Sequence, residues 1–453
     1  MLKRALLLAA LAAAPLAAQT HPADNVSAER LEKDVAKLVS FGTRHTLSSQ
    51  TDPARGIGAA VDWGLEEFKR IGAKCGGCLD VLPVGETVTG PRMPTPTLVR
   101  NAVAIQRGTE RPNEVVIVQG HIDSRVTDVM DATSDAPGAN DDGSGTALVI
   151  EAARVLSGTK YPTTIIYALL SGEEQGLHGG QILANWAEAQ GFTVKAVLNN
   201  DIVGNSCGSD GYCEPKIVRV FSEGPRADLT DRLRAAQTRF GGENDTPSRN
   251  LSRWVADLAA KDAGGLQVRQ IWRTDRMGRG GDQVPFLQKG YPAIRFSVGV
   301  EDYDHQHQDL RSEDGVVYGD TIDEMDFAYL AGVTKLNVRA LDALARAPMP
   351  PKVTVDAAVR VDTQVSWEAV LGAENYRFYA RRTDEPSWVS DTDLPTEQGL
   401  IVSAHGRTIR NTVAVRGDDW LFGVAACAGE VGQFCSPVSS AVPGGAFEPV
   451  GKE

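Results

Sequence analysis

The chain of 453 residues lacks an excess of positive charge. It carries 46 Lys and Arg residues against 59 Asp and Glu residues, which gives a formal net charge of −13. A surface that binds nucleic acid needs clustered Lys and Arg side chains against the phosphates. The acidic balance therefore argues against nucleic acid as a partner, and it gives no reason to expect attachment to an anionic membrane.

Long hydrophobic runs are also missing, except at the N-terminus. Lys3 and Arg4 precede the apolar run Ala5–Leu16, and small residues follow it. This order is typical of a secretory signal peptide; the alternative is an anchor that stays uncleaved. The run is too short for a stable transmembrane helix. We predict a signal peptide over residues 1–18, no membrane span, and export to the periplasm or the extracellular space.

Cysteine is scarce, and the six residues fall into three close pairs: Cys75/Cys78, Cys207/Cys213 and Cys427/Cys435. An exported protein meets an oxidising compartment, so such pairs favour local disulfides. The spacing of the first pair also suits half a zinc site or a redox motif. However, no second pair with zinc-ribbon spacing lies near it, and no thioredoxin-like pattern surrounds it.

The order of the expected elements predicts an α/β fold. Helical periodicity marks three segments, residues 27–40, 55–71 and 327–346. From residue 114 onward, β-branched runs alternate with helical segments, which indicates a mixed, largely parallel central sheet flanked by helices. Before that point, residues 79–106 alternate as antiparallel strands do, and we expect Pro91, Pro94 and Pro96 to form the loop between them.

The length of the chain predicts at least two domains, because a single small core does not accommodate so many residues. Three prolines, at positions 348, 350 and 351, form a stiff boundary after the last expected helix. We therefore assign residues 19–348 to the α/β domain and residues 352–445 to a second domain.

The second domain is predicted to be a small all-β sandwich. Its β runs are short, and turn residues recur about every ten positions. Val365-Ser-Trp followed by Asn375-Tyr-Arg-Phe-Tyr resembles fibronectin type III domains. The region of Leu421 lacks the corner tyrosine that is usual in those domains.

Polar residues gather in four short segments at the ends of expected strands. These four polar segments are Gly-His-Ile-Asp-Ser (120–124), Gly-Ala-Asn-Asp-Asp-Gly-Ser-Gly (138–145), Ser-Gly-Glu-Glu-Gln-Gly (171–176) and Asn-Asn-Asp-Ile (199–202). In sheets of this class, ligands bind beyond the carboxyl ends of the strands. We therefore expect the four polar segments to meet at one site.

The side chains of these segments suit a zinc centre. Zinc takes imidazole and carboxylate ligands, and a catalytic zinc keeps one position open. Two ions need a shared carboxylate, further ligands on each side, and a free base for the proton of water. The sequence offers this set in His121, Asp141, Glu174, Asp201 and a histidine at position 305 or 307, with Glu173 left as the base.

Taken singly, each of these signals is weak. A histidine at a strand end is more often structural than a ligand, and a pair of adjacent glutamates is usually a solvated surface. Asn-Asp-Asp-Gly is more often a turn or a calcium-like loop than a zinc ligand, although the acidic pattern of an EF-hand is missing. Their joint occurrence on successive strand ends of one α/β domain favours a metal site.

The order and spacing of the four polar segments strongly resemble the secreted di-zinc aminopeptidases, over about residues 30–345. Glutamate carboxypeptidase II and the glutaminyl cyclases share the fold of that family. The resemblance implies two zinc ions per chain, with Asp141 between them and with His121 and Asp201 on separate ions. It leaves open which ion Glu174 serves.

The resemblance also assigns roles around the metals. Glu173 would be the general base and then the acid that protonates the leaving amine. Asp123 would orient His121. The peptide bond between Asp141 and Asp142 is cis in this family, so we expect it to be cis here.

The last ligand comes from the stretch Tyr303-Asp-His-Gln-His-Gln-Asp309. His305 has the family spacing to Asp309, whereas His307 resembles the Gln-His-Gln-Asp form of bacterial members, and we favour His307. Tyr303 would donate to a tetrahedral oxyanion or serve only in packing. Gln283 stands where the family has a histidine near the substrate.

The resemblance implies an exopeptidase that acts on the N-termini of peptides. An aminopeptidase is favoured over a carboxypeptidase, because the carboxypeptidase relatives use arginine clusters that we do not find in the sequence. A single-zinc glutaminyl cyclase is an alternative, but it does not need His121. A binding protein with an inactive peptidase domain is a second alternative, against which stands the complete set of proposed residues.

Overall fold

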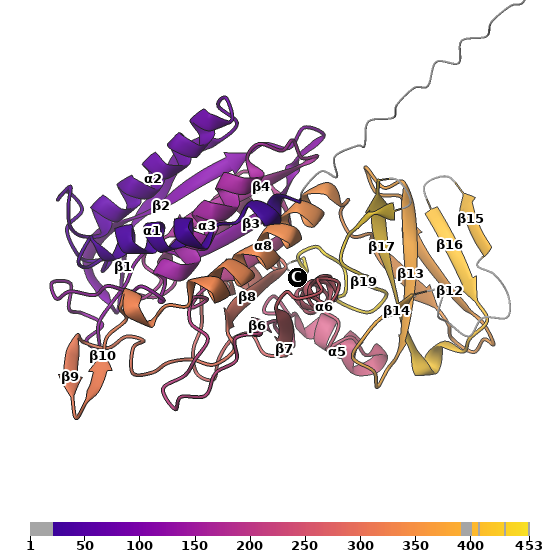
Figure 1. Ribbon diagram of the computed structural model, residues 1–453. Coiled ribbons are helices and arrows are strands. Elements are labelled where there is room, and N and C mark those ends of the chain that lie inside the picture. Colours follow the sequence, from indigo (N-terminus) through magenta and orange to yellow (C-terminus); the bar gives the residue numbers. More distant parts are fainter. Residues whose placement is uncertain (1–20, 391–400, 406–407, 430–431, 452–453) are drawn as a thin grey trace, which may run out of the picture.

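The computed structural model describes residues 21–390, 401–405, 408–429 and 432–451. The predicted signal peptide, residues 1–18, lies outside this range. Figure 1 shows two units, with the α/β unit on the left and an all-β unit on the right. Among the described residues, no helix combines the length and the apolar character needed to cross a membrane.

An eight-stranded sheet forms the centre of the α/β unit. Its strands are β1 (Asp80–Gly90), β2 (Met93–Gln106), β3 (Arg111–His121), β4 (Thr163–Leu170), β5 (Thr193–Asn200), β6 (Ile217–Phe221), β7 (Gln267–Ile271) and β8 (Ala293–Val298). They lie in the order β1-β2-β4-β3-β5-β8-β6-β7. The pairs β3–β4, β3–β5, β5–β8 and β6–β7 are parallel, and the other three are antiparallel. The predicted mixed, largely parallel sheet is therefore confirmed.

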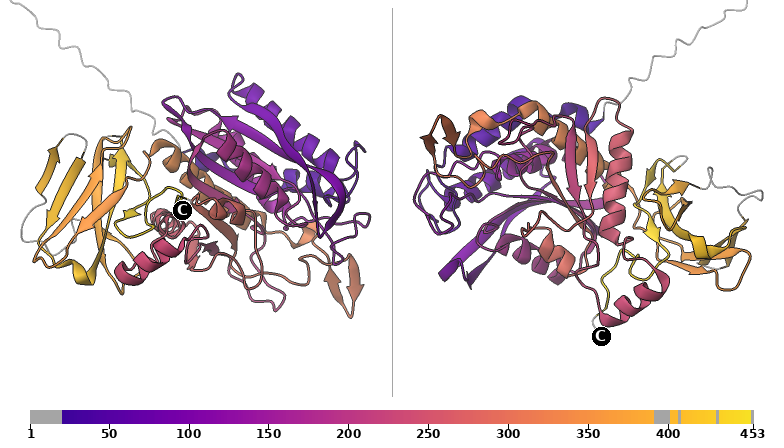
Figure 2. Two further views of the ribbon diagram at one scale, coloured as in Figure 1. Left: turned by 180° about the vertical axis from the view of Figure 1, so that it is seen from behind. Right: turned by 90° about the horizontal axis from the view of Figure 1, so that it is seen from below.

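Helices cover both faces of this sheet (Figure 2). One face carries α1 (Ala28–Val39), α2 (Ile57–Lys74), α3 (Gly143–Leu156) and α8 (Phe327–Arg346), and the other carries α4 (His178–Ala189) and α7 (Val284–Gln288). In β3, Val116 and Val118 enter the first core and Val115 and Ile117 enter the second. A strand covered on both faces reads as a continuous apolar run, as β3 does.

Further elements complete the α/β unit. They are η1 (Pro22–Asn25), α5 (Asp231–Phe240), α6 (Pro247–Ala260), η2 (Ile322–Glu324) and the two-stranded pair β9 (Arg311–Glu313) and β10 (Val316–Tyr318). The helix α6 packs beside β7 and β8 and adds Leu251 and Val255 to the first core.

The expectation that three prolines form the loop between β1 and β2 is wrong for two of them. Pro91 lies in the turn, but Pro94 and Pro96 lie inside β2. The register between β1 and β2 is irregular there, and the regular pairing resumes at Thr97 opposite Val88. Proline has no N–H to donate and is tolerated at such irregularities, where it removes no ladder hydrogen bond.

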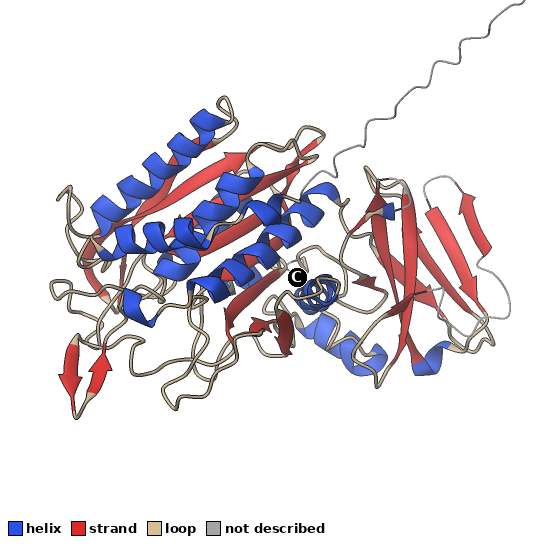
Figure 3. Cartoon of the chain, viewed as in Figure 1, coloured by secondary structure: helices blue, strands red, loops and turns tan. Residues whose placement is uncertain are grey.

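The all-β unit consists of two facing sheets, and Figure 3 shows it as strands joined mainly by loops. One sheet contains β11 (Val353–Asp356), β12 (Thr363–Glu368), β15 (Ile401–His405) and β16 (Thr408–Val413); the other contains β13 (Asn375–Arg382), β14 (Val389–Ser390), β17 (Trp420–Ala428), β18 (Phe434–Cys435) and β19 (Ser439–Ser440). A 3₁₀ turn, η4 (Gly417–Asp419), precedes β17. Both sheets supply the core, for example through Trp367 and Phe378. The predicted small β-sandwich is confirmed, whereas its fibronectin type III character and the domain limits stay predictions.

All three predicted disulfides are present, between Cys75 and Cys78, Cys207 and Cys213, and Cys427 and Cys435. A buried ion pair links the two units: Arg381 of β13 donates to both carboxylate oxygens of Asp245, at 2.7 and 2.6 Å. The sandwich is thus attached to the α/β unit in part through a buried ion pair.

Asp34 is a buried acidic residue whose pKa links the stability of the fold to pH. It belongs to α1, its side chain is buried 3.3 Å from the guanidinium of Arg30, and burial raises the pKa of Asp34 from 3.8 to about 6. A raised folded pKa means that the folded state prefers the protonated form, so this contribution to stability is present below pH 4 and is lost as the pH rises through 6.

We therefore expect Asp34→Asn to raise the free energy of unfolding at pH 8 by roughly 1–3 kcal/mol and to change it little at pH 4. Arg30 retains Glu67, 3.7 Å away, as a partner. Urea denaturation of both proteins across this pH range measures the difference. A gap that narrows toward pH 8 would contradict the expectation.

Candidate metal centre

The site lies at the carboxyl ends of three adjacent parallel strands. His121 is the last residue of β3, Asp201 directly follows β5, and Glu173 and Glu174 lie just beyond the end of β4. Because β4, β3 and β5 are neighbours in the sheet, these side chains meet at one edge. The expected meeting of the polar segments is therefore found.

The segment 138–145 reaches this edge through the N-terminus of α3. Asp142 is the N-cap of α3 and accepts from the N–H of Gly145 at 2.9 Å. A Cβ atom at Gly145 would overlap the main-chain oxygen of Asn200, so only glycine lets the helix approach β5 this closely. The peptide bond between Asp141 and Asp142 is cis, as the resemblance implied.

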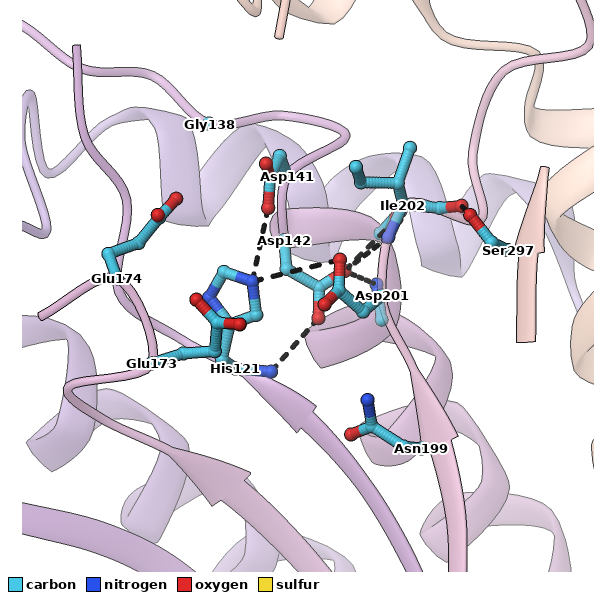
Figure 4. A network of polar contacts seen from close by, with 12 residues as sticks. His121, Gly138, Asp141, Asp142, Glu173, Glu174, Asn199, Asp201, Ile202 and Ser297 are labelled. Carbon is cyan, nitrogen blue, oxygen red and sulfur yellow. Dashed lines mark hydrogen bonds and ion pairs between the residues drawn. The ribbon is translucent and has the colours of Figure 1, made fainter. Parts of the chain in front are cut away.

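Asp141 belongs to two groups of converging side chains. On one side, His121 Nε2 lies 3.1 Å from Asp141 Oδ1 and 4.0 Å from Asp201 Oδ1. On the other side, His307 Nε2 lies 2.8 Å from Asp141 Oδ2 and 2.9 Å from Glu174 Oε1. In each group the potential ligand atoms lie within 4.8 Å of one another. In Figure 4, dashed lines join one ring nitrogen of His121 to Asp141 and to Asp201, and Glu174 lies to the left of these residues.

The two groups around Asp141 differ from the ligand pairing expected for His121 and Asp201, and they show beside which histidine Glu174 lies. His121 and Asp201 were expected on separate ions, but their side chains converge in the same group, which favours one ion for both. The reason is that β3 and β5 are adjacent in the sheet, which brings their two ends to the same side of Asp141. Glu174, whose ion was left open, lies with His307.

His305 lies apart from both groups. It contacts Asp302 and Glu324 instead, at 2.7 and 3.2 Å. His307, by contrast, faces Asp141 and Glu174, whose carboxylates raise the pKa of His307 to about 9 even though burial alone lowers it. A group of carboxylates that raises an imidazole pKa in this way attracts positive charge, so the geometry favours His307 over His305 as the ligand.

Glu173 is available beside the His121 ring, and the two residues share a third group with Glu174. Burial, together with the neighbouring Glu174 and Asp201 carboxylates, raises the pKa of Glu173 well above the usual range. A carboxylate with a raised pKa is a better base near neutral pH than an ordinary one.

Asp123 connects the ends of β3 and β4. One carboxylate oxygen lies 3.4 Å from His121 Nδ1, and the main-chain oxygen lies 3.1 Å from the same atom. The Asp123 carboxylate also accepts from the N–H groups of Glu173 and Glu174, at 3.3 and 3.2 Å. Asp123 thus lies where it would hold both the ring of His121 and the turn that carries the two glutamates.

Three further residues hold proposed ligands and were not found from the sequence. Arg125 donates to Glu174 Oε2 at 2.8 Å and also contacts the His307 ring. Arg295, fully buried in β8, lies 2.7 Å from Asp201 Oδ1. Asp320 accepts from the N–H groups of Asn140 and Asp141, both at 2.7 Å. A charged residue in an apolar strand was a signal for Arg295, whereas Asp320 gave none because it lies far away in the sequence.

Gln283 and Tyr303, which the sequence placed near the site, do not join the groups of proposed ligands. Gln283 is buried and bonds to Asp275 at 2.7 Å and to Asn199 at 3.1 Å, so it belongs to a structural network. Tyr303 is 61% exposed, which excludes a place in the core. Its N–H donates to the hydroxyl of Ser209.

The donor set fits zinc. Three carboxylates and two imidazoles, from Asp141, Glu174, Asp201, His121 and His307, converge from positions that are far apart in the sequence. Imidazole and carboxylate are the ligands of catalytic zinc sites, in which a position stays open for water or substrate. So many buried acidic groups at one point need compensating positive charge.

Comparisons with known proteins show the family to which the chain belongs. The family model described as Peptidase family M28 matches residues 101–316. A probable zinc metalloprotease of Leptosphaeria maculans is 43% identical over 88% of this chain and 92% of its own length. Another, of Pyrenophora teres, is 47% identical over 74% of this chain and 70% of its own length. The chain therefore belongs to peptidase family M28 and is related to these zinc metalloproteases.

A solved structure shows the same fold. The LapA aminopeptidase of Legionella pneumophila matches with a TM-score of 0.50 at 19% identity, over 72% of this chain and 71% of that chain. At this identity the match supports the fold alone.

Proposed function

We propose that this chain is an exported zinc aminopeptidase that removes N-terminal residues from peptides by means of two zinc ions. The observation that carries the proposal is the position of Asp141, whose two carboxylate oxygens face His121 on one side and His307 on the other, at 3.1 and 2.8 Å. A carboxylate shared in this way is what a centre for two ions requires. His121 and Asp201 would complete one ion's ligands, and Glu174 and His307 those of the other.

Zinc bound here would polarise the peptide carbonyl and lower the pKa of water. The protein's own groups would carry the protons. Glu173, beside His121, would take a proton from the attacking water and then deliver it to the amine that leaves. Asp123 would keep the turn of Glu173 in place through the N–H of that residue, 3.3 Å away.

The choice of an aminopeptidase rests on two supports. LapA of Legionella pneumophila, which shares the fold, is described as an aminopeptidase. In addition, arginines beside the centre are already engaged by carboxylates: Arg276 contacts Asp275 and Glu301, at 3.0 and 3.1 Å. Such arginines have little capacity left for the terminal carboxylate that a carboxypeptidase must recognise. A complete second ligand group argues against a single-zinc glutaminyl cyclase.

The test is a panel of aminoacyl-nitroanilides with purified protein, with and without a chelator. We expect release of nitroaniline from at least one substrate, its loss on chelation, and its return with zinc. Peptides with a blocked N-terminus should resist cleavage. If no substrate gives chelator-sensitive release, the aminopeptidase proposal fails.

Export and the role of the second unit are also proposals. The pattern of residues 1–18 supports export, and the three disulfides fit an oxidising compartment. We propose that residues 352–445 form a fibronectin type III-like domain. N-terminal sequencing of secreted protein would locate the cleavage site, with cleavage near residue 18 as the expected result.

A further inference from the structure

His307 occupies an unfavourable backbone conformation within its turn. Its φ angle is +59°, in the left-handed region that residues other than glycine occupy only when their surroundings require it. The residues 302–307 form successive turns that carry both His307 and Gln306, and Gln306 donates to Asp141 Oδ2 at 3.1 Å. Contacts from other parts of the chain must therefore hold this turn in its conformation.

The residues Ser209, Asp302, His305 and Glu324 provide such a fixing point, and we call them the His305 clamp. The His305 ring lies between two carboxylates, with Nδ1 2.7 Å from Asp302 Oδ2 and Nε2 3.2 Å from Glu324 Oε1. The side chain of His305 is mostly buried, at 14% exposure. The two ring nitrogens thus face carboxylates from the turn and from η2.

Ser209 attaches the same turn to a disulfide loop. Its hydroxyl donates to Asp302 Oδ1 at 3.0 Å and accepts from the N–H groups of Tyr303 and Asp304, at 2.6 and 3.1 Å. Ser209 lies inside the loop closed by the Cys207–Cys213 disulfide. One hydroxyl thus holds three groups at the start of the turn.

The far end of the turn is held separately. The N–H of Thr127 donates to Asp309 Oδ1 at 3.2 Å, and the N–H of Asp309 donates to the Thr127 hydroxyl at 3.3 Å. Arg125, two residues before Thr127, contacts the His307 ring itself. The clamp and this reciprocal pair therefore hold His307 from both sides in sequence.

We propose that the His305 clamp positions His307 and thereby sets the zinc affinity of the Glu174–His307 group, while the His121–Asp201 group does not depend on it. This inference rests on the proposed two-zinc function. It makes His305 a positioning residue for the Glu174–His307 group, and not a member of that group; Asp302, His305 and Glu324 lie close enough together to form a separate group of potential ligands. It also predicts that the Cys207–Cys213 loop contributes to metal binding although neither cysteine contacts a proposed ligand.

The experiment measures zinc affinity rather than activity. Full-length His305→Ala and Ser209→Ala are titrated with zinc against a competing chelator, beside Asp201→Ala and His307→Ala, which mark the loss of the first and the second ion. We expect the second ion to bind about 10- to 100-fold more weakly in both clamp variants, as when outer partners of a ligand are removed. The affinity of the first ion should be unchanged. Ser209→Thr keeps the hydroxyl and should retain the second ion.

Ser134→Ala is the matched control, because the Ser134 hydroxyl also bonds an aspartate, Asp131 at 2.6 Å, but on an exposed turn away from His307. It should bind zinc as the unaltered chain does. The proposal is overturned if the clamp variants keep the second ion at full affinity, if they lose both ions equally, or if the unaltered chain binds one ion only. Should His305→Ala not fold, Ser209→Ala with Ser209→Thr decides the question.

The result of the zinc titrations does not depend on which substrate the protein cleaves. A chain that binds two ions but cleaves no nitroanilide would contradict the aminopeptidase proposal and would leave the zinc titrations valid. A chain that cleaves its substrates but shows no effect in the clamp variants would contradict only the clamp.

Discussion

Glu173→Gln should reduce hydrolysis of the best nitroanilide substrate by about 10²–10⁴-fold, the range that a positioned general base contributes. Glutamine keeps the size and the hydrogen-bonding shape of the side chain but has no basic oxygen for the proton of water. The remaining activity would come from the metals and from substrate binding. The loss should appear in kcat, because Glu173 is proposed to act in the chemical step.

Zinc content separates this role from a structural one. Glu173 is not assigned to either ligand group around Asp141, so the variant should bind as much zinc as the unaltered chain. Glu66→Gln is a suitable control, since Glu66 pairs with Lys69 on an exposed face of α2. Full activity in Glu173→Gln would refute the base, and a loss of zinc in that variant would instead make Glu173 a ligand.

The sequence predicted the parts of the fold that depend on local pattern. The apolar runs of β3, β4 and β5 are continuous because these strands are covered on both faces, and α8 was recognised from residues 327–346 by its apolar period. The helix α5 was not predicted. Only Leu233 and Gln237 of that helix are buried, so it has no regular apolar face to reveal it.

Part of the candidate site could also be predicted from local sequence pattern. His121, Glu173, Glu174 and Asp201 were found because they end strands, where parallel sheets bind ligands. The convergence of His121 and Asp201 in one group was not predicted, because the order of strands in a sheet cannot be read from local sequence pattern. The His305 clamp could not be predicted from the sequence either, because Ser209, Asp302 and Glu324 come together only in the folded chain.

Asp141→Ala should have the largest effect of any single substitution in the centre. If Asp141 is shared by both ions, its removal weakens both ligand groups at once, whereas Asp201→Ala and His307→Ala each weaken one. We expect bound zinc to fall below one ion per chain, and kcat/KM to fall by about 10⁴-fold or more, since the metals supply several kcal/mol of transition-state stabilisation.

Comparing Asp141→Ala with Asp201→Ala and His307→Ala shows whether both ions share Asp141. Zinc titration should show two affected ions in Asp141→Ala and one in each of the others, with Asp231→Ala, at an exposed position of α5, as the control. Thermal unfolding in the presence of a chelator should be similar for Asp141→Ala and the control, because Asp320 holds the backbone of this segment through N–H groups that the substitution retains. If Asp141→Ala still binds one ion at full affinity, Asp141 serves a single ion, and the shared carboxylate on which the two-zinc proposal rests is refuted.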